Sequence, residues 1–113
     1  MKRGDIVLLP FPWTDLKNYT LRPALVISDD SYNKHSNDAI FLFVTTREYK
    51  DLYDLRLKKT DSSYKQTGLQ AASTFRMGKL ATLEQKLALR RLGYADEKLL
   101  RKIESGLKLL LNI

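Results

Sequence analysis

Polar residues at the ends of two apolar runs are the first candidates for chemistry. Arg22 stands just before Pro23 at the start of PALVIS, and Thr45 and Thr46 end the run AIFLFVTT. Proline biases the preceding residue toward an extended backbone, so Arg22 is held at the entrance of a strand. A guanidinium on a fixed stem can bind a phosphate through two hydrogen bonds, and a hydroxyl beside it can donate another. Together the two groups suit stabilisation of a phosphoryl transition state.

The arginine and the two threonines also have an ordinary structural explanation. Arg22 can form an ion pair with one of three carboxylates, those of Asp5, Asp15 and Asp29. Threonine is common in strands because its β-branched side chain fits a pleated surface. The residue types leave both explanations open. His35, in the loop NKHSND, has no partner at any motif spacing and is expected at the surface.

Aromatic and basic side chains gather in the segment before Arg22. Trp13 and Tyr19 lie on either side of Lys17, a composition that suits stacking on the bases of single-stranded nucleic acid. Phe11 is expected instead to cover one end of the core. A structural role of that kind stays open for Trp13 and Tyr19 as well.

Composition narrows the classes of site that the chain can hold. Its 113 residues suit one domain, which we place at residues 1–113. It has no cysteine and one histidine, which excludes disulfides, thiolate metal sites and a zinc site of several histidines within one chain. The formal charge of +7 favours a polyanionic partner if a site confirms it. No stretch is long and apolar enough to cross a membrane, so a cytoplasmic protein is expected.

Apolar runs and turn-forming residues predict mainly short strands followed by one helix. We expect strands within residues 5–9, 23–28, 39–46, 52–57 and 68–83, the last segment holding one or two strands with Gly78 as a possible bulge. From Asp96, which can cap the first amides, apolar residues recur at spacings of three and four. They are Leu99, Leu100, Ile103, Leu107, Leu110 and Leu111. This order predicts a mostly β fold, a small barrel or strongly curved sheet with a C-terminal amphipathic helix packed across it.

Five segments follow one another over almost the whole chain. They are RGDIV, then RPALVIS, then DAIFLFVTT, then TGLQAASTFRMGKLATL, and finally the leucine-rich helix. In this order they resemble the MazF/PemK family of toxin endoribonucleases. The resemblance implies an SH3-like barrel, a homodimer and metal-independent cleavage of single-stranded RNA, held in check by a cognate antitoxin. It also implies that Arg22 and Thr45 carry the catalysis.

The remaining candidates concern binding of the RNA strand. We assign this role to Trp13, Lys17, Tyr19, Thr46 and Ser73, the last being the polar residue best placed in the segment after GLQAA. Other classes of function stay open, because a fold does not fix a function. A non-catalytic SH3-like module that binds nucleic acid or protein, or a toxin that acts on a protein target, would have a similar sequence.

Overall fold

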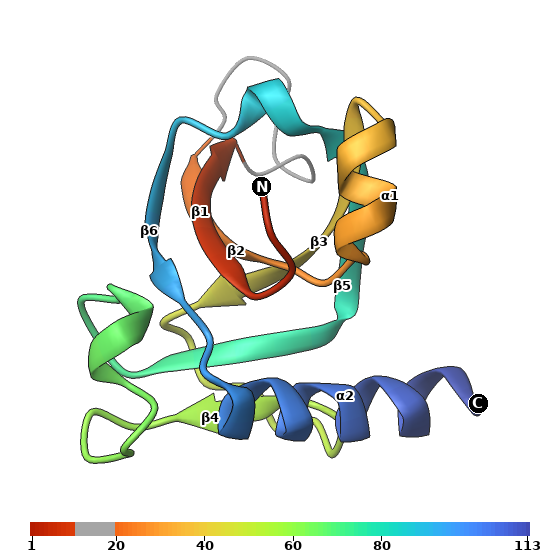
Figure 1. The fold of residues 1–113 in the computed structure, drawn as a ribbon. Coiled ribbons are helices and arrows are strands. Elements are labelled where there is room, and N and C mark those ends of the chain that lie inside the picture. The colour runs from red at the N-terminus through yellow and green to blue at the C-terminus, as the bar shows by residue number, and fades with distance from the viewer. Residues whose placement is uncertain (11–19) are drawn as a thin grey trace.

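The computed structural model describes residues 1–10 and 20–113, which form one curled antiparallel sheet with helices around it (Figure 1). The six strands lie in the order β4-β5-β3-β2-β1-β6. Their bounds are β1 Asp5–Pro10, β2 Leu21–Val26, β3 Asp38–Thr45, β4 Leu55–Leu57, β5 Ser73–Glu84 and β6 Arg90–Tyr94. The helices are α1 Asp30–His35 and α2 Glu97–Leu111, with short 3-10 turns η1 Lys65–Thr67 and η2 Gln85–Leu87. The predicted mostly β, barrel-like fold with a C-terminal helix is confirmed.

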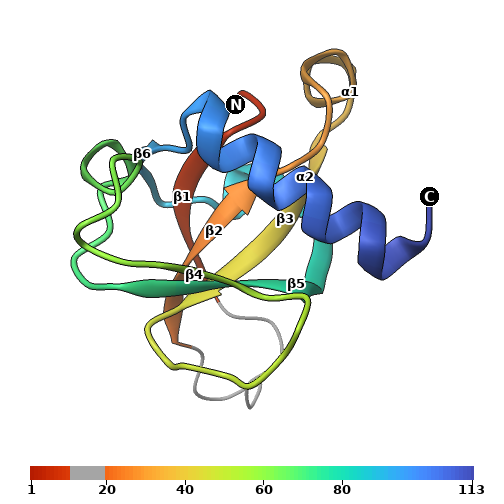
Figure 2. The same cartoon turned by 90° about the horizontal axis from the view of Figure 1, so that it is seen from below.

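Each face of the sheet carries its own apolar cluster, because successive residues of a strand point to opposite faces. Helix α2 packs across one face (Figures 1 and 2), where Leu25 of β2 and Leu42 of β3 meet Leu99 and Ile103. The other face carries the inner cluster of Val7, Leu9, Ala24, Val26, Ala39, Phe41 and Phe43. Strands β2 and β3 therefore have side chains packed on both faces, which holds their ends firmly in place.

Helix α2 begins at the predicted cap. The Asp96 carboxylate accepts a hydrogen bond from the Leu99 amide at 2.9 Å, and the Ser63 hydroxyl and Gln66 side-chain amide donate to it at 2.7 and 2.8 Å. The predicted apolar face holds for Leu99 and Ile103, which are buried, but Leu111 is 52% exposed. Within the part of the chain described, no helix is long and apolar enough to cross a membrane.

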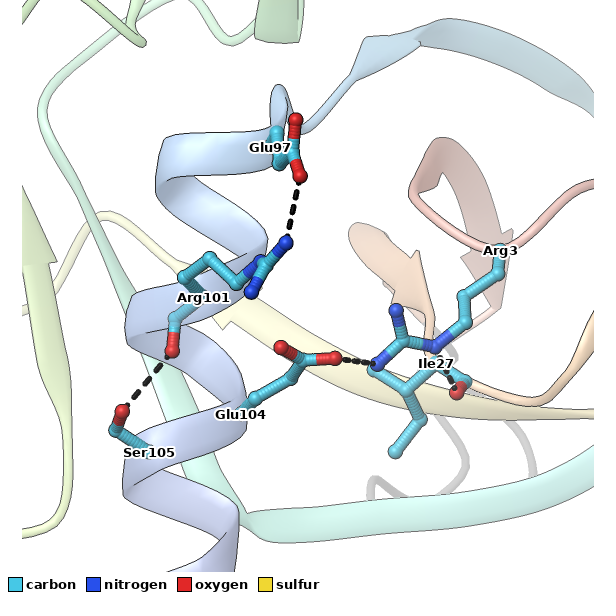
Figure 3. A network of polar contacts seen from close by, with 6 residues as sticks. All are labelled: Arg3, Ile27, Glu97, Arg101, Glu104 and Ser105. Atoms are coloured by element: carbon cyan, nitrogen blue, oxygen red, sulfur yellow. Dashed lines mark hydrogen bonds and ion pairs between the residues drawn. The ribbon is translucent and has the colours of Figure 1, made fainter.

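A polar network ties the middle of α2 to the N-terminal segment (Figure 3). The Arg3 guanidinium donates to Glu104 at 2.8 Å and to the Ile27 carbonyl at 3.1 Å. A second ion pair on the same helix joins Arg101 to Glu97 at 2.6 Å, and both of its side chains are exposed. The partly buried network fixes the position of α2 relative to β2, whereas the exposed pair adds little.

Three local features differ from the sequence-based expectation. Helix α1 forms where turn-forming residues predicted a loop, because Asp29 caps it by accepting from the Ser31 amide. Strand β6, which the apolar pattern did not reveal, is an edge strand held by pairing with β1 and largely exposed. The strand expected at 52–57 is only Leu55–Leu57, since the residues before it form an exposed turn in which the Asp54 amide donates to the Asp51 carbonyl at 3.2 Å.

Candidate active site

The sheet brings Arg22 and Thr45 to one place. Ala24 lies opposite Phe43 and Leu25 opposite Leu42, and the same register continued outward sets Arg22 opposite Thr45. Both side chains line a single cavity of about 300 Å³. Two residues 23 positions apart in sequence therefore share a site because β2 begins where β3 ends.

Neighbouring residues support the side chains of Arg22 and Thr45 at the cavity. Alternation places Arg22 and Thr45 on the face of the inner cluster, just beyond Phe43, so their stems rest on a packed core. Leu9 of β1 pairs with Arg22 from the other side. The Thr45 hydroxyl oxygen accepts from the Arg47 amide at 3.2 Å, and a hydroxyl that accepts this bond can still donate its own proton.

A bend in β5 adds cations that the sequence pattern did not reveal. The register of β5 against β3 shifts opposite Phe43, within the segment that contains Gly78, where the sequence predicted a bulge. Arg76 and Lys79, on either side of that glycine, line the cavity with Arg22. Two basic residues flanking a glycine in FRMGK were the signal that could have found them. Among the described residues that line the cavity there is no carboxylate.

Arg76 is held from two directions. Its Nε lies 2.7 Å from the Asp54 carboxylate, and its guanidinium carbon lies 3.7 Å from the centre of the Tyr49 ring. A cation over an aromatic face is stabilised by the ring's electrons. Tyr49 itself lines the cavity, so the stack forms part of the wall.

Asp54 is a buried carboxylate, with its side chain 4% exposed. Burial raises the pKa of Asp54, and the nearby Arg76 and the hydrogen bond from the Met77 amide offset this only in part. The ionised form therefore depends on Arg76 as its counter-ion.

The other predicted contacts are divided between a second cavity and residues outside the described part of the chain. Thr46 and Ser73 line a separate cavity of about 360 Å³ together with Arg90, Gln70 and Pro23. Ser73 is buried, and its hydroxyl donates to the Ala71 carbonyl at 2.8 Å. The three remaining RNA-binding candidates, Trp13, Lys17 and Tyr19, lie outside the described residues.

Two of the three carboxylates considered as ion-pair partners of Arg22, those of Asp5 and Asp29, have other contacts. Asp5 contacts Arg91 at 3.0 Å, at the far end of β1 from Leu9, the residue that pairs with Arg22. Asp29 caps α1. Asp15 lies outside the described residues. His35 is exposed, as expected.

Known proteins resemble this chain over almost its whole length. A family model described as PemK-like, MazF-like toxin of type II toxin-antitoxin system matches residues 2–111. The chain belongs to this toxin family. The MazF-like toxin described here is also 25% identical, over 114 residues, to an endoribonuclease MazF of Staphylococcus saprophyticus, with 100% of this chain and 92% of that protein covered.

Solved structures resemble the fold of this MazF-like toxin over its full length. An endoribonuclease in complex with its cognate antitoxin from a mycobacterial species gives a TM-score of 0.80 at 18% identity, covering 100% of this chain and 96% of that one. A MazE–MazF complex from Deinococcus radiodurans gives 0.78 at 23% identity, covering 100% and 97%. In the described part of the MazF-like toxin, no group of three or more His, Cys, Asp or Glu side chains is arranged to hold a metal ion.

Proposed function

We propose that this toxin acts as a single domain, residues 1–113, that cleaves single-stranded RNA as an endoribonuclease without a metal ion. The observation that carries the proposal is the shared cavity of Arg22 and Thr45, reached from two strands and lined otherwise by cations, Tyr49 and apolar residues. Membership of a toxin family, and similarity to a relative named as an endoribonuclease, support RNA as the substrate.

The chemistry needs few protein groups because RNA carries its own nucleophile. The 2′-oxygen loses its proton and bonds to the adjacent phosphorus, while the bond from phosphorus to the 5′-oxygen breaks and that oxygen gains a proton. The products are a 2′,3′-cyclic phosphate and a 5′-hydroxyl. The protein must align these atoms and stabilise the charge on the non-bridging oxygens. Arg22 neutralises that charge, and Thr45 donates a hydrogen bond to it.

The RNA strand must extend beyond the scissile phosphate. Thr45 and Thr46 are neighbours, yet Thr45 lines the catalytic cavity and Thr46 lines the second cavity with Ser73. An RNA strand that leaves the catalytic cavity at the end of β3 can therefore reach the second cavity. We assign Thr46 and Ser73, with Trp13, Lys17 and Tyr19, to binding of the flanking nucleotides. Arg90 in the second cavity supplies a cation for a phosphate there.

Two protein partners and a compartment accompany this function. We propose a cognate antitoxin with an acidic segment, because Arg22, Arg76 and Lys79 line the cavity that it would block. We propose a homodimer in which the end of α2 takes part, since Leu109, Leu111 and Ile113 are 71%, 52% and 84% exposed while Leu110 packs on the core. An RNA substrate and the absence of cysteine favour the cytoplasm.

The test is cleavage of a long RNA in the presence of EDTA, with product ends identified by mass spectrometry. We expect cyclic phosphate and 5′-hydroxyl ends at defined sites. An oligonucleotide with a single 2′-deoxy sugar at a mapped site should stay intact, because it lacks the nucleophile. Loss of activity in EDTA would contradict metal independence. RNA left intact under all conditions would favour the binding module or the protein-directed toxin.

A further inference from the structure

The buried carboxylate of Asp54 stands behind the catalytic cavity, where it contacts a lining residue instead of the cavity itself. The contact between Arg76 Nε and Asp54 Oδ2, at 2.7 Å, is an ion pair shielded from solvent, and neither atom has a hydrogen-bond partner among the described residues. The other carboxylate oxygen, Oδ1, accepts from the Met77 amide at 3.1 Å. Asp54 therefore holds both the side chain of Arg76 and the backbone that follows it.

This contact is poorly explained as a device for stability alone. Burying an aspartate costs solvation free energy, and the raised pKa of Asp54 shows that its partners do not fully compensate. Residues that only stabilise a fold are more often apolar at such positions, because replacing a buried ion pair with packed apolar groups is often neutral or stabilising. The geometry instead fixes the direction of a cation at the cavity wall.

The loop from Thr46 to Asp54, which carries Asp54 and Tyr49, is fixed at both ends. At its start, the Arg56 guanidinium donates to the Thr46 carbonyl at 2.8 Å and to the Thr74 hydroxyl at 2.9 Å. At its end, Asp54 joins the loop to the bend of β5. Tyr49, between these two points, covers one face of the Arg76 guanidinium. With one face and the Nε edge of Arg76 engaged, its two terminal nitrogens are the donors that can reach a phosphate in the cavity.

We propose that Asp54 is a positioning residue for RNA cleavage, which orients Arg76 so that its guanidinium meets the substrate phosphate beside Arg22 and Thr45. This role rests on the proposed function and adds to it a residue that does not itself touch the substrate. Orientation set before binding spares the entropy of ordering a long side chain at the reaction step.

The test is a double-mutant cycle with Asp54→Asn, Arg76→Ala and the double variant, measured as single-turnover cleavage of single-stranded RNA. Asparagine keeps the size of aspartate and removes its charge. We expect Asp54→Asn to lower the cleavage rate about 100-fold, the scale expected when a reacting group is misplaced. In the Arg76→Ala background the same substitution should change the rate less than twofold. A purely structural role would cost the same factor in both backgrounds, and that result would overturn the proposal.

A matched control separates this effect from the loss of any buried ion pair. Asp5 also pairs with an arginine, Arg91, and its side chain is 15% exposed, but it lies away from the cavity residues. Asp5→Asn should leave cleavage unchanged, and thermal unfolding of each variant checks the fold. If Asp54→Asn does not fold, Arg76→Lys decides, because lysine keeps the charge but not the Nε–H contact. A lysine variant with wild-type rate would overturn the proposal.

Binding of an uncleavable 2′-deoxy strand, measured on the same four proteins, keeps the two hypotheses apart. A wild type that binds the strand but leaves RNA intact contradicts the proposed function alone, and the coupling between residues 54 and 76 is then read from affinity. A wild type that cleaves RNA while the substitutions act additively in both measurements overturns only the role of Asp54.

Discussion

Two carboxylates, that of Asp54, which is buried, and that of Asp96, which is partly buried, have opposite electrostatic environments. Burial would raise the pKa of Asp96, but hydrogen bonds from the Leu99 amide, Ser63 and Gln66, together with nearby Lys98, outweigh it and hold that pKa below the ordinary value. For Asp54, burial outweighs the effects of Arg76 and the Met77 amide, and the pKa is raised. The surroundings of Asp96 stabilise its ionised form, whereas those of Asp54 destabilise it.

The difference separates a structural region from a functional one. Asp96 joins the start of α2 to the η1 region through neutral donors, which is what a cap requires. The counter-ion of Asp54 is Arg76, a cation that lines the cavity. The free-energy cost of burying Asp54 therefore accompanies the placement of that cation. The cavity region should therefore control cleavage with little effect on folding, and the cap region should do the reverse.

The largest expected effect comes from removing the main cation of the cavity. Arg22→Ala should lower the cleavage rate about 1,000-fold or more, because the charge that develops on the phosphate loses its closest counter-ion. The free energy of unfolding should change little. Arg101→Ala, which removes an exposed arginine from α2, is the control and should keep full activity. An active Arg22→Ala enzyme would remove the cavity from the mechanism.

The next effect concerns the hydroxyl at the end of β3. Thr45→Val keeps the β-branched shape and removes the hydroxyl, which is the proposed donor to the phosphate and the acceptor for the Arg47 amide, so we expect about a 100-fold fall in cleavage rate with the fold intact. Thr82→Val, at an exposed position of β5, serves as the control. The rates are measured at saturating RNA, where an effect on KM alone would disappear. A loss confined to KM would reassign Thr45 from the transition state to substrate binding.

Local sequence patterns predict the part of the site that lies at strand ends. Arg22 is found because Pro23 fixes its backbone, and Thr45 and Thr46 because they close an apolar run; both signals act over a few residues. The family resemblance then selects Thr45 of the two threonines. The cap at Asp96 and the bend at Gly78 are found for the same reason. Each depends on neighbours in sequence, which is what periodicity and turn chemistry record.

The residues that the sequence did not reveal depend on contacts between distant segments. In the sequence, Asp54 has the pattern of an alternating residue in a half-exposed strand, and the bend of β5 brings Arg76 against it. Strand β6 has no apolar alternation and exists because β1 offers an edge to pair with. Such features follow from tertiary pairing, for which a single sequence carries no local signal.

A smaller effect is expected in the cap region, and it should appear in stability. Asp96→Ala removes the N-cap of α2 and leaves Ser63 and Gln66 without their acceptor, which should lower the free energy of unfolding by about 2 kcal/mol. Urea denaturation measures this change. Cleavage by the folded protein should stay at the wild-type rate. A fall in rate as large as that of Thr45→Val would mean that the two regions are coupled.

The smallest effect is the pH dependence of stability, which should have opposite sign at the two carboxylates. Because the pKa of Asp96 is lowered on folding, its contribution is present above about pH 4 and is lost as pH falls through the lowered value. Because the pKa of Asp54 is raised, its contribution is present below about pH 4 and is lost as pH rises through the raised value.

Urea denaturation of the wild type, Asp96→Asn and Asp54→Asn across this range tests the sign. The difference in unfolding free energy between wild type and Asp96→Asn should grow with rising pH, and that for Asp54→Asn should shrink. A difference of one unit in pKa corresponds to about 1.4 kcal/mol, so the slopes are measurable. Slopes of the same sign would mean that Arg76 compensates Asp54 fully, and the ion pair would then contribute to stability as the cap does.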